Sequence, residues 1–115
     1  MTELEVTITR EQIRAYADAS GDHNPIHLEE AAARAAGLPG VIAHGMLQMG
    51  LLARVAGPPE RLRRLSCRFA GMVVPGDTLR FEGVEGPDGT VRLTAVKQDG
   101  TAVLSRAVAE VGSRG

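Results

Sequence analysis

Near the N-terminus, apolar and polar side chains alternate over residues 3–9, where every second residue is aliphatic. This period of two predicts a half-buried β-strand. Thr9 is followed three residues later by Gln12, which is the spacing of a capping box. A short helix should therefore run from there to about residue 19.

Two more helices are predicted in the first half of the chain. Asn24 and Pro25 indicate the start of one over residues 25–36, because Asn is a favoured N-cap and Pro a favoured first helical residue. Residues 43–56 are the most apolar stretch, and a helix that is apolar on nearly all sides belongs inside a domain. That helix is too short to span a membrane.

The second half of the chain alternates apolar and polar residues again, and Pro-Gly-Asp, Pro-Asp-Gly and Asp-Gly turn signals interrupt the alternation. The pattern predicts four strands, over residues 61–72, 78–86, 91–96 and 101–111. Consecutive strands joined in hairpins build an antiparallel sheet. We therefore expect residues 1–115 to form a single α+β domain whose sheet wraps the apolar helix.

Composition narrows the class of protein. The 115 residues carry a net charge of −1, which argues against nucleic-acid binding because phosphate neutralisation needs a basic surface. The single cysteine, Cys67, excludes an internal disulfide framework and a Cys-based zinc site. It favours a reducing, cytoplasmic compartment. Residues 1–12 lack the basic and apolar regions of a signal peptide, and no apolar run predicts a membrane span.

The residues that can carry chemistry lie in one short segment and at the start of the apolar helix. Asp22 stands just before the predicted cap at Asn24, and His27 lies in the first helical turn, so the chain can bring both side chains to one spot. A carboxylate and an imidazole together suit proton transfer around one substrate or water. The backbone N–H of Gly45, at a helix start, suits a developing oxyanion. These groups predict chemistry beside a carbonyl.

Three segments in this order resemble one known family, the MaoC-like, (R)-specific enoyl-CoA hydratases, or hydratase 2 family. They are residues 16–27, which contain SGD and NPIH, residues 42–46 (IAHGM), and residues 68–79, which contain RF and VPGDTL. The resemblance implies a hot-dog fold, in which a curved antiparallel sheet wraps a central helix.

The same resemblance implies reversible addition of water to a trans-2-enoyl thioester of CoA or acyl carrier protein, which gives the (R)-3-hydroxyacyl thioester. Asp22 and His27 would hold and activate the water and manage the α-carbon proton. Asn24 would order the loop, and the backbone N–H of Gly45 would bind the thioester oxygen. No metal or redox cofactor is implied, because the thioester supplies its own electron sink.

Some weaker candidates have structural explanations that stay open. The further residues predicted to bind substrate are Ser20, His44, Met46, Arg64 and Arg68. Arg64 and Arg68 would contact the phosphates of CoA or of a carrier-protein arm, although a solvated strand face explains them as well. His44 is expected mainly as a structural residue at the helix end. A His/Asp metal site that includes His23 is conceivable, but Pro25 disrupts the helical spacing and no metal is expected.

The expected assembly is a homodimer, because a lone hot-dog unit leaves a sheet edge exposed, and a heterodimer with a sibling subunit is the alternative. Two other functions stay open. A hot-dog acyl thioesterase would release free CoA. A weakly catalytic thioester-binding subunit would bind acyl-CoA without turnover, and the substitution Asp22→Asn would not change that binding.

Overall fold

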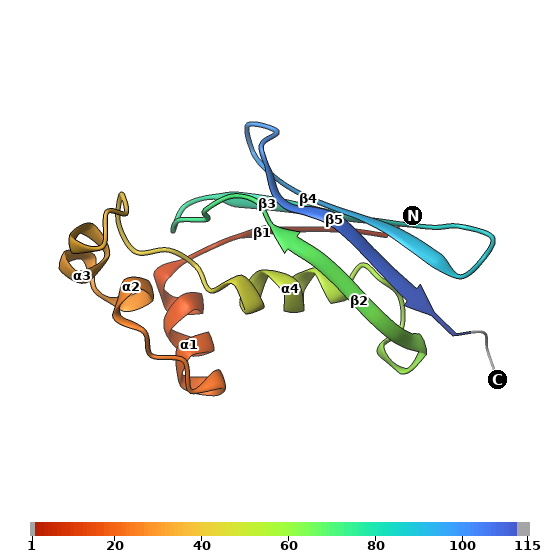
Figure 1. Cartoon of the computed structure of the whole chain (residues 1–115), viewed down its shortest axis with the longest axis horizontal. Coiled ribbons are helices and arrows are strands. Elements are labelled where there is room, and N and C mark those ends of the chain that lie inside the picture. The colour runs from red at the N-terminus through yellow and green to blue at the C-terminus, as the bar shows by residue number, and fades with distance from the viewer. Residues whose placement is uncertain (1, 113–115) are drawn as a thin grey trace.

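The computed structural model describes residues 2–112, and its main feature is an antiparallel sheet that curves over one helix (Figure 1). The elements are β1 (Thr2–Thr7), α1 (Arg10–Ser20), α2 (Pro25–Leu28), α3 (Glu30–Ala35), α4 (Gly45–Ala53), the 3-10 turn η1 (Pro59–Arg61), β2 (Leu62–Phe69), β3 (Thr78–Glu85), β4 (Thr90–Lys97) and β5 (Ala102–Val111). Helices α1, α2 and α3 gather at the end of the molecule where α4 begins.

The five strands have the order β1-β3-β4-β5-β2, and every neighbouring pair is antiparallel. The predicted hairpins β3-β4 and β4-β5 are confirmed. The prediction that all four late strands form consecutive hairpins is wrong for β2, which pairs with β5 at the far edge. The segment after β2 instead bonds to the residue that follows β1: Ile8 N–H donates to Asp77 O at 2.8 Å, and Gly76 N–H donates to Ile8 O at 2.8 Å. These bonds start β3 beside β1.

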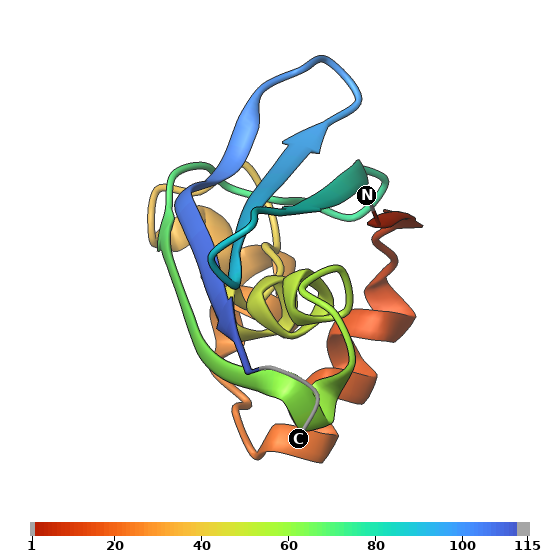
Figure 2. The ribbon, with the colours of Figure 1, turned by 90° about the vertical axis from the view of Figure 1, so that its right-hand side faces the viewer.

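Helix α4 lies in the hollow of the sheet (Figure 2). Leu52 of α4 and Leu79 and Phe81 of β3 are fully buried in one apolar cluster. The approach is so close at Gly83 that an added Cβ would lie 2.0 Å from the carbonyl oxygen of Val55. The predicted α+β class and hot-dog fold are confirmed.

The helix starts follow local signals, and two helix lengths do not. Thr9 and Gln12 form the predicted capping box of α1. The helix predicted over residues 25–36 is broken into α2 and α3 at Glu29, whose backbone is extended (φ −123°, ψ 119°). The apolar helix is shorter than residues 43–56 at both ends: His44, whose backbone is extended, is its N-cap, and its last residue is Ala53.

No helix in residues 2–112 is long and apolar enough to cross a membrane.

Candidate active site

A series of short turns shapes the loop between α1 and α2. Gly21 ends α1 in the left-handed conformation (φ +80°), and the Ser20 hydroxyl accepts from Asp22 N–H at 3.2 Å. The Asp22 carboxylate accepts from Asn24 N–H at 3.3 Å, and the Asn24 side chain accepts from Ile26 N–H at 3.2 Å. Asn24 therefore caps α2 as predicted. Ser20, predicted to bind substrate, here orders the turn that presents Asp22.

The ring of His27 is oriented by the segment that precedes α4. Its Nδ1 lies 2.8 Å from the carbonyl oxygen of Ile42. A carbonyl can only accept, so Nδ1 carries the proton and Nε2 of the neutral ring holds a free lone pair. Ile42 N–H also donates to Ile26 O at 3.2 Å, which fixes the residue before His27 to the same segment.

His44 is the most enclosed polar group of this region, with 2% of its surface exposed. Its Nε2 donates to the backbone carbonyl of Asp22 at 3.0 Å, so it ties the Asp22 loop to the start of α4. Its ring stacks on His27 with centroids 3.8 Å apart, and Tyr16 lies 4.8 Å away. His44 thus links the two side chains predicted to act together.

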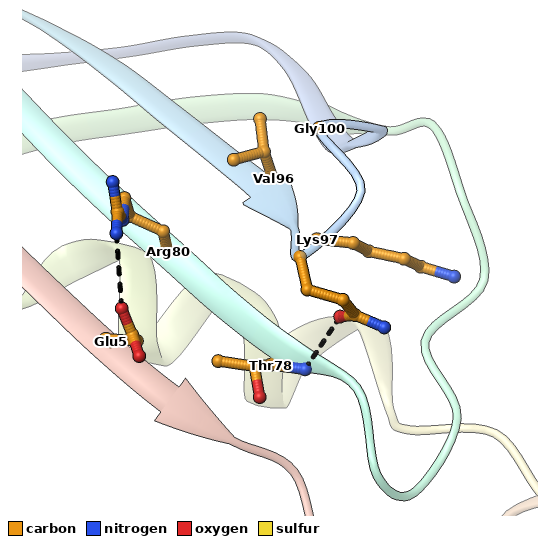
Figure 3. Close-up of a pocket in the computed structure, with 7 residues that line it drawn as sticks. Glu5, Thr78, Arg80, Val96, Lys97 and Gly100 are labelled. Carbon is orange, nitrogen blue, oxygen red and sulfur yellow. Dashed lines mark hydrogen bonds and ion pairs between the residues drawn. The ribbon is translucent and has the colours of Figure 1, made fainter.

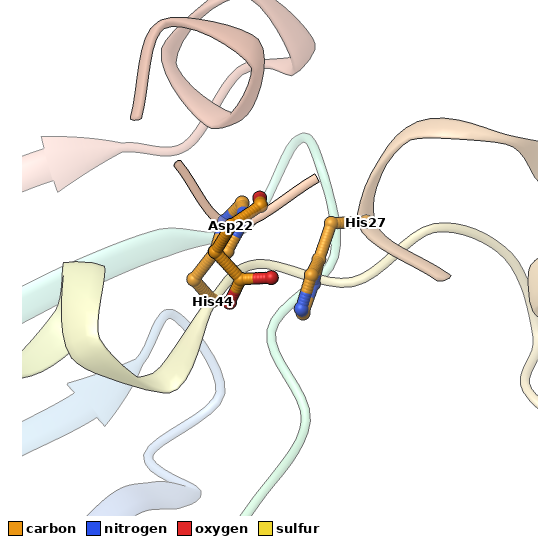
Figure 4. Close-up of side chains that lie close together, drawn as sticks. All are labelled: Asp22, His27 and His44. Atoms are coloured by element: carbon orange, nitrogen blue, oxygen red, sulfur yellow. The ribbon is translucent and has the colours of Figure 1, made fainter. Parts of the chain in front are cut away.

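The structure brings Asp22, His27 and His44 to one point. One ligand-type atom from each lies within 4.8 Å of the other two, and the side chains converge from three segments of the chain (Figure 4). Asp22 is exposed and His27 half-buried, so a substrate can reach both. This arrangement can hold a small molecule and move a proton to or from it.

Two imidazoles and one carboxylate are also a familiar ligand set for divalent metals. The fit is poor here, because a metal ion lies in the plane of each imidazole that binds it. The rings of His27 and His44 are stacked with only 25° between their planes, so their lone pairs do not meet at one ion. The geometry suits proton transfer better.

Gly45 begins α4 beside this cluster. The first N–H groups of a helix have no intrahelical partner, and the helix dipole makes this end positive. An added Cβ at Gly45 would lie 3.0 Å from the Phe69 ring. Phe69 itself is 55% exposed. A side chain at position 45 would therefore require the Phe69 ring to move aside. In the sequence Phe69 is recognisable only as part of the RF motif, and nothing near it in the chain predicts its contact with Gly45.

The other predicted substrate-binding residues are spread along the surface. Met46 follows Gly45 and is largely exposed. Arg68 adjoins Phe69, whereas Arg64 lies five residues from Phe69 along β2, which is about 16 Å of strand. Arg64 lines a shallow pocket of about 200 Å³ that contains none of the Asp22, His27 and His44 cluster.

Three further details concern the surroundings of the site. His23 contacts Asp18 of α1, with Nε2 and Oδ1 3.0 Å apart, and is not one of the three clustered residues. A pocket of about 250 Å³ borders His27 and is lined by Arg10, Glu11, Arg14, His27, Leu28 and Val41. A larger one, of about 390 Å³, lies around Thr78, Lys97 and Gly100 and holds no predicted site residue (Figure 3).

The fold and the cluster define a hot-dog domain with a carboxylate–imidazole site beside a helix start. Residues 1–107 match the family model of the MaoC-like domain, so the chain belongs to that family.

The chain spans only a small part of the length of the curated relatives that it matches. It is 36% identical over 109 residues to the peroxisomal hydratase-dehydrogenase-epimerase of Neurospora crassa. The match covers 94% of this chain and 12% of that protein. It is 42% identical over 83 residues to 3-hydroxyacyl-thioester dehydratase X of Mycobacterium tuberculosis, covering 71% of this chain and 30% of that one. The solved structure of the R-hydratase PhaJ1 from Pseudomonas aeruginosa matches with a TM-score of 0.81 at 29% identity, over 97% of this chain and 78% of that chain.

Proposed function

We propose that the chain catalyses the reversible addition of water to trans-2-enoyl thioesters and so forms (R)-3-hydroxyacyl thioesters. The observation that carries the proposal is the convergence of Asp22 and His27 next to the start of α4. The family membership and the hydratase and dehydratase names of similar proteins support it.

In the proposed reaction, the thioester oxygen accepts a hydrogen bond from Gly45 N–H, which draws electron density away from the C2–C3 double bond. A water molecule donates one hydrogen bond to the Asp22 carboxylate and one to Nε2 of His27. As the water oxygen bonds to C3, Nε2 takes its proton, and negative charge collects on the thioester oxygen. His27 then delivers a proton to C2, which restores the neutral ring. Dehydration follows the same steps in reverse.

The backbone carbonyl that orients His27 matters for this chemistry. Because Nδ1 is committed to Ile42 O, only Nε2 is left to accept the proton. The imidazolium formed would be stabilised by Asp22 on one side and by the Ile42 carbonyl on the other.

The test is hydration of a short and a medium trans-2-enoyl-CoA by the purified chain, with chiral analysis of the product. We expect an (R)-3-hydroxyacyl product and a loss of about 10²-fold or more in kcat for Asp22→Asn and for His27→Gln. His23→Gln is the matched control, because His23 contacts Asp18 rather than the cluster, and it should keep its activity. Free CoA as the product would indicate a thioesterase instead. Acyl-CoA binding without turnover, unchanged in Asp22→Asn, would indicate a binding subunit.

We further propose that the unit works as a homodimer in the cytoplasm on CoA or carrier-protein thioesters, with Arg68 near their phosphates. Edge strand β2 pairs with β5 alone in the sheet of residues 2–112. Exposed Phe69 ends β2 beside Gly45, exposed Met46 follows Gly45 in α4, and exposed Met72 lies three residues after Phe69. Burial raises the pKa of the Cys67 thiol, which keeps the thiol protonated and unreactive. Light scattering should give twice the chain mass. A monomer that gains activity only with a sibling subunit would favour the heterodimer.

A further inference from the structure

Only one hydrogen bond connects the loop that carries Asp22 to the start of α4. It runs from Nε2 of His44 to the backbone carbonyl of Asp22 and is 3.0 Å long. Within residues 2–112, every other hydrogen bond of residues 20–24 stays inside α1, the loop itself and α2. The place of the Asp22 carboxylate relative to α4 should therefore depend on His44.

His44 is the firm side of this contact, and Asp22 is the side that can move. His44 is 2% exposed. Immediately before it, Ala43 N–H donates to the carbonyl oxygen of buried Val73 at 2.8 Å, which holds this backbone in the core. Asp22 is exposed. A change of the His44 side chain should therefore displace the loop rather than α4.

The two ring nitrogens of His44 have different surroundings. Nε2 faces a carbonyl, which can only accept, so Nε2 carries the proton. Nδ1 is buried and has no hydrogen-bond partner in the described part of the chain. A second proton on Nδ1 would be buried without an acceptor, which is costly. His44 is therefore a neutral donor to the loop and not a group that exchanges protons with the substrate.

The segment just before α4 connects to every group of the proposed reaction. The carbonyl of Ile42 orients His27, and His44 holds the loop of Asp22. The next residue, Gly45, offers its own N–H. In an enoyl thioester, C3 and the thioester oxygen belong to one conjugated unit, so the substrate itself fixes the distance between them. Water held by Asp22 reaches C3 only if Asp22 stands at the matching distance from Gly45, and small misplacements are costly in rate.

We propose that His44 is a positioning residue for the hydration reaction. Its Nε2–H bond to the Asp22 carbonyl sets the distance between the Asp22 carboxylate and the N–H of Gly45. His44 acts through Asp22 and touches no reacting atom. This role rests on the proposed hydratase function for its catalytic meaning.

Two amide substitutions separate the hydrogen bond from the ring. The amide nitrogen of Gln is as many bonds from Cβ as Nε2 of His, whereas that of Asn is a bond closer. His44→Gln therefore keeps a donor that can reach the Asp22 carbonyl, and His44→Asn does not, although both lose the ring. We expect kcat for hydration of a trans-2-enoyl-CoA to be about tenfold lower in His44→Asn than in His44→Gln. KM should differ little, because Asp22 acts on the water.

The bond itself can be observed without substrate. A hydrogen bond deshields the carbonyl carbon that accepts it, so the ¹³C′ resonance of Asp22 in the labelled full chain reports on His44. We expect nearly the wild-type position in His44→Gln and an upfield shift in His44→Asn. His44→Phe keeps an aromatic ring against His27 and has no donor, so it should show the upfield shift and the lower kcat as well. It replaces His44→Asn if that variant does not fold.

A double-variant cycle tests whether His44 acts through Asp22. The comparison of His44→Gln with His44→Asn is repeated in chains that also carry Asp22→Asn, which keeps the backbone carbonyl and lacks the carboxylate. We expect the difference in kcat to shrink to less than about twofold, because the displaced loop no longer carries the reacting group. A merely structural role of His44 would leave the difference unchanged.

Several results would overturn the positioning role. It fails if His44→Gln and His44→Asn have equal kcat, if the Asp22 ¹³C′ resonance is the same in both, or if the difference in kcat persists beside Asp22→Asn. If the expected resonance shifts are found in a chain that has no hydratase activity, the bond between His44 and Asp22 stands and the proposed function fails.

Discussion

The sheet with α4 and the segment from Ser20 to His44 obtain their geometry from different interactions. In the first region, fully buried side chains such as Leu52 and Phe81 fill the space between helix and strands. In the second, short side chains and imidazoles bond to backbone groups, and Asp22 and Asn24 stay exposed. The first region should therefore respond to substitution mainly in stability and the second mainly in activity.

The largest expected effect is on the sheet, at Gly83. An added methyl group would lie 2.0 Å from the Val55 carbonyl oxygen, which belongs to backbone and cannot move aside cheaply. We expect Gly83→Ala to lower the free energy of unfolding by about 3 kcal/mol, the upper part of the usual range for overpacking. Urea unfolding followed by circular dichroism measures it. Gly50→Ala is the control, because a Cβ there has nothing within 4 Å. Equal stability of Gly83→Ala and wild type would contradict the close approach.

The next effect is on the site, at Gly45. A methyl group there would press on the Phe69 ring at 3.0 Å and disturb the N–H proposed to bind the thioester oxygen. We expect Gly45→Ala to lose about tenfold to a hundredfold in kcat, which is less than the loss on removing an oxyanion donor. Unfolding should be little affected, because Ala is the better helix former. The double variant with Phe69→Leu should recover part of the activity. No recovery would mean that the ring is not the obstacle.

A third substitution tests Asp77, a buried carboxylate directly before β3. Asp77 is almost buried and accepts from Val74 N–H at 3.0 Å, and it contacts Gln98 at 3.2 Å and Lys97 at 3.2 Å. Burial alone would raise the pKa of Asp77, but these partners together hold that pKa below its usual value. Its contribution to stability is therefore present near neutral pH and is lost as the pH falls through this lowered pKa.

We expect Asp77→Asn to destabilise the fold by about 1–3 kcal/mol at pH 7, the usual cost of leaving buried partners unsatisfied. The acid-induced loss of stability should be smaller in the variant than in the wild type, because the titrating group is gone. Unfolding curves at several pH values measure both effects. A parallel pH dependence in the two proteins would show that Asp77 does not contribute to it.

The smallest effect concerns the loop at the site. Asn24→Ala removes the side chain that caps α2, so we expect a loss of about 1 kcal/mol in stability. Activity should fall more than stability alone explains, because the same loop holds Asp22. Thermal melts and initial rates on one preparation test this. Full activity together with the stability loss would show that capping of α2 by Asn24 does not support catalysis.

Local signals account for much of what the sequence predicts. The capping box at Thr9, the cap at Asn24 and the two late hairpins each depend on residues close together in the chain, and all are confirmed. The break at Glu29 depends on Ile42 bonding back to Ile26 and on His27 bonding to Ile42. Ile42 lies outside the segment 25–36, so the hydrophobic pattern of that segment alone does not predict the break.

The candidate site likewise contains residues whose meeting is predictable from nearby signals and a residue that reaches the site from far along the chain. Asp22 and His27 are five residues apart, and the turn signals between them already predict that they meet. His44 reaches Asp22 from 22 residues away, so no pattern close to either residue predicts that contact. Pairing of β2 with β5 joins residues still further apart in sequence, such as Leu62 and Val111, and escaped prediction for that reason.

The central claim is that Asp22 and His27 act together on water at an enoyl thioester. It is tested most directly by chiral analysis of the product formed from a trans-2-enoyl-CoA, for wild type, Asp22→Asn, His27→Gln and the control His23→Gln. We predict an (R)-3-hydroxyacyl product from wild type and control, and rates lower by about 10²-fold or more in the two site variants. Equal rates in all four proteins, or an (S) product, would contradict the claim.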